Sequence, residues 1–175
     1  MPYVGQTITE VFPTSINVDT ATIATANIAN KFTDANMAAG SVLQVVQVTF
    51  TTDVEITATS YTHYSAADAA ITCSSTSSKV LILADINVGP WQNNSNDTQQ
   101  AIRIYKGGSA LSREVFTRLY DYGGNGILSK VSATINHLDS PNSTSELTYQ
   151  LYFKMISGDR AAVKNGSFTL MEIAG

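Results

Sequence analysis

The sequence predicts an all-β protein, a jelly-roll-like antiparallel β-sandwich head preceded by an extended N-terminal arm. Three observations carry this prediction. From Gly40 onward, apolar residues recur at the two-residue period of strands, and clusters of glycine, proline and asparagine separate the runs. Charged residues make up only 14% of the chain, against roughly 25% in an average globular protein. Residues 1–40 show no strand period. We therefore divide the chain into an arm, 1–40, and a head domain, 41–175.

The arm carries its larger apolar residues singly. They follow one another at intervals of four or five residues, which fits neither a helix nor a strand, at Val18, Ile23, Ile28, Phe32 and Met37. Two interpretations stay open. The segment is either an extended arm that inserts these side chains into partners, or a pentapeptide-like coil, which would need several complete turns to bury a core. A short helix over 27–37 is also compatible with the sequence. We favour the arm and predict that these five residues attach the protein to its partners.

The head is organised around its longest apolar run, Ser74 to Val88. A polar serine and threonine cluster precedes this run, and Gly89-Pro90 stops it. Since Val80 to Leu83 are consecutive apolar residues, we expect a central strand that is covered on both faces. One face would lie on the core of its own sheet, and the other against a second layer or a neighbouring subunit.

The apolar pattern predicts further strands on both sides of this run, and the strand over 42–48 is expected to be mostly buried. The ranges are 42–48, 54–60, 71–73, 100–106, 115–120, 131–137, 147–156 and 167–173. Residues 66–70 are compatible with a helix but are too few to propagate one, and Asn165-Gly166 predicts a turn. Eight or more strands separated by turns predict a jelly roll or a related sandwich.

Side chains suited to catalysis or to cofactors are scarce. His63 and His137 lack the spacing of a metal site. The carboxylates of Glu114, Asp121 and Asp139 are better explained as solvated loop groups than as the acid and base of a glycosidase. We therefore expect no enzymatic activity, no cofactor and no bound metal.

Charge and composition also limit the partners. The net charge is −4, and only Lys31 precedes Lys79 among the ten lysines and arginines, so no basic stripe is available for nucleic acid. No apolar run approaches the roughly 20 residues of a membrane span, and MPYVGQTITE lacks the features of a signal peptide. We expect synthesis in a cytoplasm, no membrane insertion, and a buried, unreactive Cys73.

Aromatic side chains in or beside loops are the candidates for ligand binding. Flat rings flanked by asparagine and glutamine are typical of sugar-binding surfaces. The predicted glycan contacts are Trp91, Tyr120 and Tyr122. The alternative for Trp91 is that it packs under its own loop.

Several segments, in their order along the chain, resemble a structural domain that recurs in tailed bacteriophages, particularly phages of cyanobacteria and other aquatic hosts. They are GSVLQVVQV, STSSKVLI, HLDSPNSTSELTYQLYF and SFTLMEIAG, and together they span residues 40–175. The start, MPYVGQT, resembles the opening of phage fibre-type proteins. The resemblance implies a trimeric β-sandwich head on the virion exterior, where family members serve as fibre tips or, when short, decorate or cement capsids. It carries over no functional residues.

The arm would reach at most about 130 Å when fully extended, which is short for a fibre shaft. We therefore expect a non-enzymatic structural protein on the virion surface, assembled in the host cytoplasm. It would be a homotrimer that decorates or cements the capsid, with the arm on the major capsid protein. Its subunit interface would use strands that are apolar on both faces, such as 80–83 and 149–156. The alternative is a tail-fibre or receptor-binding tip that contacts tail proteins and recognises a host-surface glycan.

Overall fold

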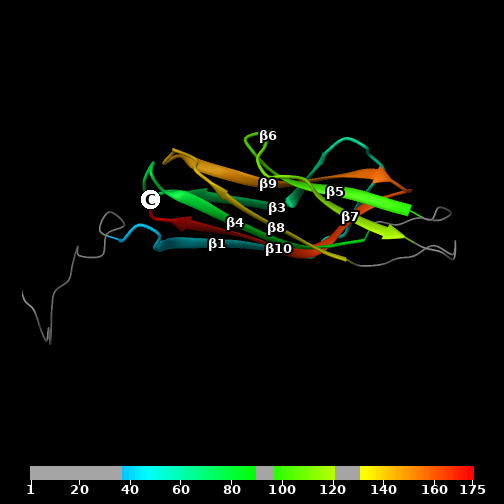
Figure 1. The fold of residues 1–175 in the computed structure, drawn as a ribbon, viewed down its shortest axis with the longest axis horizontal. Coiled ribbons are helices and arrows are strands. Elements are labelled where there is room, and N and C mark those ends of the chain that lie inside the picture. The colour runs from blue at the N-terminus through cyan, green and yellow to red at the C-terminus, as the bar shows by residue number, and fades with distance from the viewer. Residues whose placement is uncertain (1–36, 90–96, 121–130) are drawn as a thin grey trace, which may run out of the picture. The chain divides into compact units, whose positions relative to one another are not determined.

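The computed structural model describes residues 37–89, 97–120 and 131–175, except for the side chain of Tyr120. Within these ranges the chain forms strands and turns but no helix, and so it has no helix there that could cross a membrane. The strands in Figure 1 are β1 (Val42–Phe50), β2 (Val54–Ile56), β3 (Thr62–Thr72), β4 (Lys79–Val88), β5 (Asp97–Lys106), β6 (Ser109–Ala110), β7 (Val115–Tyr120), β8 (Val131–Asp139), β9 (Glu146–Ser157) and β10 (Ala161–Ile173).

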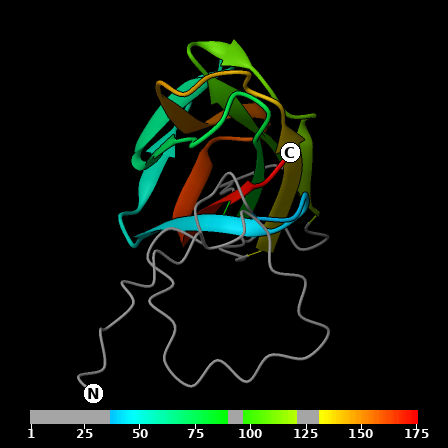
Figure 2. The ribbon, with the colours of Figure 1, turned by 90° about the vertical axis from the view of Figure 1, so that its left-hand side faces the viewer.

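The strands form two antiparallel sheets that face each other (Figure 2). Sheet A has the order β1-β10-β4-β8, with β2 also paired to β10. Sheet B has the order β3-β9-β5-β6, with β7 also paired to β5. When the short strands β2 and β6 are set aside, the first strand pairs with the last, the second with the seventh, the third with the sixth and the fourth with the fifth. This nested pairing is how an antiparallel ribbon wraps into a jelly roll. The prediction of an all-β antiparallel sandwich is confirmed for the head, while the extended arm and the trimer stay predictions.

The core lies between the two sheets and follows the alternation of their strands. In β4 the residues Val80, Ile82, Ala84, Ile86 and Val88 are at most 1% exposed. The facing sheet contributes large side chains from β3 and β9, including Tyr64, Tyr149, Leu151 and Phe153. Cys73 is buried as expected. The central-strand prediction is therefore confirmed for the face of β4 that points to the core.

Two strands differ in extent from the prediction. The strand expected over 54–60 is only β2, and the strand expected over 71–73 is the longer β3, which also takes in the stretch 66–70 that was too short to propagate a helix. Strand β3 pairs with β9 at 62–64 and again at 69–72, and the side chains of Ala67 and Ala69 are buried in the core. A register shift between Tyr64 and Ala69 accommodates the irregular part of the strand. Tertiary pairing has thus overridden a weak local preference.

Asn165-Gly166 is not a turn, because β10 runs through it and pairs with β1 and β4. A Cβ atom on Gly166 would lie 2.3 Å from the backbone oxygen of Asp85 and 2.8 Å from the ring of Phe50. The glycine therefore permits a close approach between neighbouring strands. The amide of Asn165 accepts a hydrogen bond from Asn87 at 2.6 Å.

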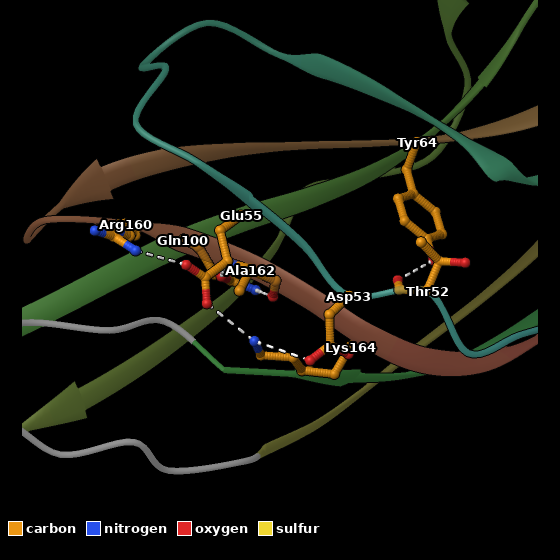
Figure 3. A network of polar contacts seen from close by, with 8 residues as sticks. All are labelled: Thr52, Asp53, Glu55, Tyr64, Gln100, Arg160, Ala162 and Lys164. Atoms are coloured by element: carbon orange, nitrogen blue, oxygen red, sulfur yellow. Dashed lines mark hydrogen bonds and ion pairs between the residues drawn. The ribbon is translucent and has the colours of Figure 1, made fainter.

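Polar side chains tie β10 to its neighbours at the end where it begins (Figure 3). The side chain of Lys164 is only 8% exposed, and its ammonium lies 3.1 Å from Glu55 and 3.3 Å from Asp53. The buried amide of Gln100 accepts a hydrogen bond from the backbone N–H of Ala162 at 2.9 Å and donates one to its carbonyl at 3.3 Å. The Gln100 contact links sheet B to sheet A, and the Lys164 contacts tie β10 to β2 and to the residue just before β2.

Candidate functional site

The five residues predicted to attach the protein lie mostly outside the described part of the chain. Val18, Ile23, Ile28 and Phe32 are not described, and Met37 is. The Met37 side chain is 37% exposed. It borders a hollow of about 310 Å³ together with Leu43, Ala174, Gly175 and serines of the turn between β3 and β4. The arm therefore joins the head at the end of the sandwich where β1 begins and β10 ends.

The predicted glycan contacts fall at the edge of the described residues. Trp91 and Tyr122 lie outside them, and Tyr120 ends β7 with only its backbone described. Tyr120 is the register partner of Asp97, the first residue of β5. The segments 90–96 and 121–130 therefore attach to sheet B at neighbouring positions.

An apolar row crosses the outward face of sheet A. It consists of successive register partners on four strands, Val45 on β1, Met171 on β10, Leu81 on β4 and Leu138 on β8. Directly paired residues of antiparallel strands share a face. Because the flanking residues Ile82 and Leu170 point into the core, the row points outward.

The apolar row is exposed among the described residues. Val45 and Leu138, at its two ends, are 56% and 52% exposed, and Met171 and Leu81 between them are half-buried. Val42 and Leu83 extend the apolar surface to either side. A sheet face that is meant for water normally carries polar residues, and an exposed apolar patch marks an interaction surface. This face of the head is therefore a candidate assembly surface.

The sequence pointed to only part of the apolar row. The run Val80 to Leu83 predicted that β4 is apolar on both faces, and Leu81 and Leu83 do lie on the outer face. Val45 belongs to the strand 42–48, which was expected to be mostly buried, and that expectation is wrong because Val42 and Val45 are 50% and 56% exposed. The sequence alone does not link Val45 to Met171 and Leu138, because their strands are far apart in it. Only the register of β1, β10, β4 and β8 brings them into line.

Sheet B carries an aromatic row on its outward face. The rings of Tyr105 and Tyr152 stack at 4.1 Å, His63 stacks on Tyr152 at 5.0 Å, and Tyr61 lies 5.7 Å from Tyr105. All four side chains are half-buried. The Lys154 ammonium lies 4.6 Å from the centre of the Tyr61 ring, a cation–π arrangement.

Hydrogen bonds fix both ends of the aromatic row. The Tyr61 hydroxyl donates to Glu114 at 2.5 Å, and Lys154 pairs with the same carboxylate at 3.0 Å. Burial, reinforced by this bond, raises the pKa of Tyr61, and the bonds from Tyr61 and Lys154 lower the pKa of Glu114. At the other end, His63 Nε2 and Asp68 Oδ1 lie 2.6 Å apart.

The arrangement of the aromatic row favours packing over chemistry. Its ring faces are turned toward one another, and the polar groups of Tyr61 and His63 already have partners. Across the described ranges, no cluster of three or more histidine, cysteine, aspartate or glutamate side chains could hold a metal ion.

Comparison with known proteins found no matching family model and no matching curated protein. Among solved structures, the chain is similar to the particle protein of infectious bursal disease virus, at 13% identity over 75% of this chain and 31% of that one, with a TM-score of 0.43. A subviral particle of VP2 from the same virus matches at 15% identity over 75% and 33%, with a TM-score of 0.38. A pilus protein of Bacillus endospore appendages matches at 14% identity over 79% and 96%, with a TM-score of 0.32. The chain thus spans about a third of the length of the virus proteins.

Proposed function

We propose that the protein is a non-enzymatic structural protein of a virion exterior, a short trimeric surface protein that decorates or cements the capsid through residues 1–40. The observation that carries this proposal is the exposed apolar row of sheet A. Covering such a row is favourable by roughly 25 cal/mol for each Å² of apolar surface removed from water. A head built in this way functions by associating with other protein surfaces.

Two further features support a virion component over other assemblies. The nested pairing of the two sheets is that of the jelly roll, an architecture used by viral capsid domains among other proteins. The segments between 40 and 175 that resemble tailed-phage structural proteins connect this fold to the virion exterior. Since one fold hosts many functions, the fold by itself would not select among them.

The test is the location of the protein in a virion reconstruction, together with light scattering on the purified full chain. We expect trimers in solution and density over the head lattice. A variant that lacks residues 1–36 should fold but fail to incorporate, because the predicted anchors Val18, Ile23, Ile28 and Phe32 are removed. Incorporation of that variant at wild-type occupancy would refute attachment through the arm. Absence of the protein from purified virions would refute the proposal as a whole.

A tail-fibre or receptor-binding tip is the second candidate. The register pair Asp97 and Tyr120 favours it, because the segments that carry Trp91 and Tyr122 join sheet B side by side there. Density at the tail and binding on a glycan array would support this function. Binding should then decrease in Trp91→Ala and Tyr122→Ala, and should persist in the control Phe116→Ala, which changes an exposed ring elsewhere on β7.

A further inference from the structure

We infer that the outward face of sheet A pairs two copies of this chain, face to face about a two-fold axis that passes over Ile82 in β4. In this contact Leu81 of one copy lies opposite Leu83 of the other. Lys79 of each copy lies opposite Asp85 of the other. The inference goes beyond the proposed function, because neither a virion role nor a trimer requires a two-fold contact.

The outward side chains of β4 have a self-complementary order. Lys79, Leu81, Leu83 and Asp85 alternate with buried residues, so the outward face of the strand presents a cation, two leucines and an anion. When the strand is turned end for end about Ile82, each charge meets the opposite charge and each leucine meets a leucine. A two-fold contact has this property, since residue i of one copy touches residue j of the other, and j touches i.

The two charges stand on a surface that is otherwise uncharged. Directly paired residues of neighbouring strands share a face, and in the described chain the outward register positions beside β4 from Lys79 to Asp85 carry no charge. These positions are Ile173, Met171, Thr169 and Ser167 on β10, Val42, Val45, Gln47 and Thr49 on β1, and Leu138, Asn136 and Thr134 on β8. Among the described residues, neither Lys79 nor Asp85 forms an ion pair within the chain. Both charges are exposed and available to a partner.

The dimensions of packed sheets allow these contacts. Lys79 and Asp85 are six residues apart, which places each of them about 10 Å from the axis at roughly 3.4 Å per residue. Two sheets that pack face to face lie about 10 Å apart, with their strands within about 30° of one another. At that angle the opposed charges are offset sideways by about 5 Å, which the flexible four-carbon stem of lysine covers.

The charges also select one alignment of the apolar row. If the row lay directly on its own copy, Lys79 would face Leu83 of the other copy and both ions would lose water without gaining a partner. A shift that centres the axis on Ile82 pairs the ions and keeps Leu81 and Leu83 in contact. Charges that are arranged in this way fix the register of an interface more than they add to its affinity.

The size of the patch indicates a weak contact. Four strands at about 4.8 Å and seven residues at about 3.4 Å give a patch of roughly 19 Å by 24 Å. This flat area, on the order of 450 Å² per subunit, is small beside the roughly 800 Å² of surface that each partner buries in a standard interface. The pairing therefore depends on concentration. Because each face pairs once, the contact in the proposed trimer joins subunits of different trimers.

Exchange of the two charges tests the inference on the purified full chain. Sedimentation equilibrium should show that the mass of the wild type rises above that of its low-concentration species as the protein approaches about 1 mM. Lys79→Glu and Asp85→Lys each place like charges opposite one another and should raise the dissociation constant roughly tenfold or more. The double variant restores opposite charges and should recover most of the association.

A second pair of exposed charges provides the matched control. Arg113→Glu and Glu146→Lys make the same changes in charge outside sheet A and should leave the association unchanged, alone or together. Far-UV circular dichroism checks that every variant folds. A mass that does not rise with concentration, equal effects in the control pair, or no recovery in the double variant would overturn the inference. The location of the protein in virions is measured separately, so a protein that pairs but is absent from virions would refute the proposed function alone, and the converse result would refute this inference alone.

Discussion

The buried carboxylate of Glu172 offers the sharpest test of how the head is held together. Its side chain, on β10, is 1% exposed and accepts hydrogen bonds from the Ser74 N–H and hydroxyl, both at 2.7 Å, and from the Gln44 amide at 2.6 Å. It thus joins β10, β1 and the turn after β3. Burial alone would raise the pKa of Glu172, but the hydrogen bonds, led by those of Ser74, lower it below its usual value. The fold therefore favours the charged form.

Glu172→Gln should lower the free energy of unfolding by about 1–3 kcal/mol near neutral pH. The two bonds from Ser74 lose their charge, and the new NH₂ group faces a Gln44 amide that already donates to the Thr72 carbonyl at 2.7 Å. Hydrogen bonds to charged groups contribute about 1.5–3 kcal/mol each, and relief of charge burial offsets part of this loss.

The contribution of Glu172 to the free energy of unfolding should depend on pH. Because the folded pKa lies below the unfolded value, the contribution of Glu172 is present above about pH 4.5 and is lost as the pH falls through the folded pKa. Urea denaturation of the wild type and Glu172→Gln should therefore converge in acid. The exposed Glu146→Gln is the control and should change stability by less than about 0.5 kcal/mol. A gap between wild type and Glu172→Gln that persists unchanged to about pH 3, or no gap near neutral pH, would refute the reasoning.

Four further variants probe other contacts by urea denaturation. Lys164→Met should lower the free energy of unfolding by less than about 1 kcal/mol, because it removes a buried charge and leaves carboxylates that are partly solvated. The double variant Asp53→Asn with Glu55→Gln leaves the buried ammonium without a charged partner and should lower it by about 2–4 kcal/mol. Gly166→Ala should cost about 1–3 kcal/mol or more, since its Cβ would meet the backbone of β4. Gln100→Leu should cost about 1–3 kcal/mol by leaving a buried N–H of β10 without a partner.

Matched controls separate these effects from general loss of stability. Arg160→Met removes the exposed partner of Glu55 and should change stability by at most about 1 kcal/mol. Gly107→Ala meets nothing within 4 Å and is strained only by its φ of +56°, so its cost should stay near 1 kcal/mol. A larger loss of stability in Lys164→Met than in the double variant of Asp53 and Glu55 would contradict this reasoning, because the buried ammonium would then not be the group that depends on its charged partners.

The strands were largely predictable because their signal is local. In the strand 147–156, the residues Tyr149, Leu151 and Phe153 alternate with polar neighbours, and all three are buried. The local sequence did not predict the backbone conformation of segments that depend on contacts with distant strands. Asn165-Gly166 has the composition of a turn, yet Gly166 is needed for close contact with β4. The alanine stretch 66–70 lies within β3, which is paired with β9 on either side of residues 65–68.

The candidate site was less predictable for a related reason. That β4 is apolar on both faces could be read from Val80 to Leu83, which are consecutive in sequence. The complete row could not, because Val45, Met171 and Leu138 become neighbours only through the strand order of sheet A. The five attachment residues and Trp91 and Tyr122 stay predictions, with Met37 alone described at the entry to the head.

The two outward faces suggest how the head divides its tasks. On sheet B the aromatic side chains are satisfied within the chain, by stacking and by the bonds of Tyr61 with Glu114 and of His63 with Asp68. On sheet A, Val45 and Leu138 have no comparable cover among the described residues. The fold is stabilised by the packing of the inner sheet faces and by the buried hydrogen bonds of Glu172. The outer face of sheet A can therefore be apolar without altering the core. A partner that covers it would add association energy to a head that is already folded, which is what a protein that assembles after folding requires.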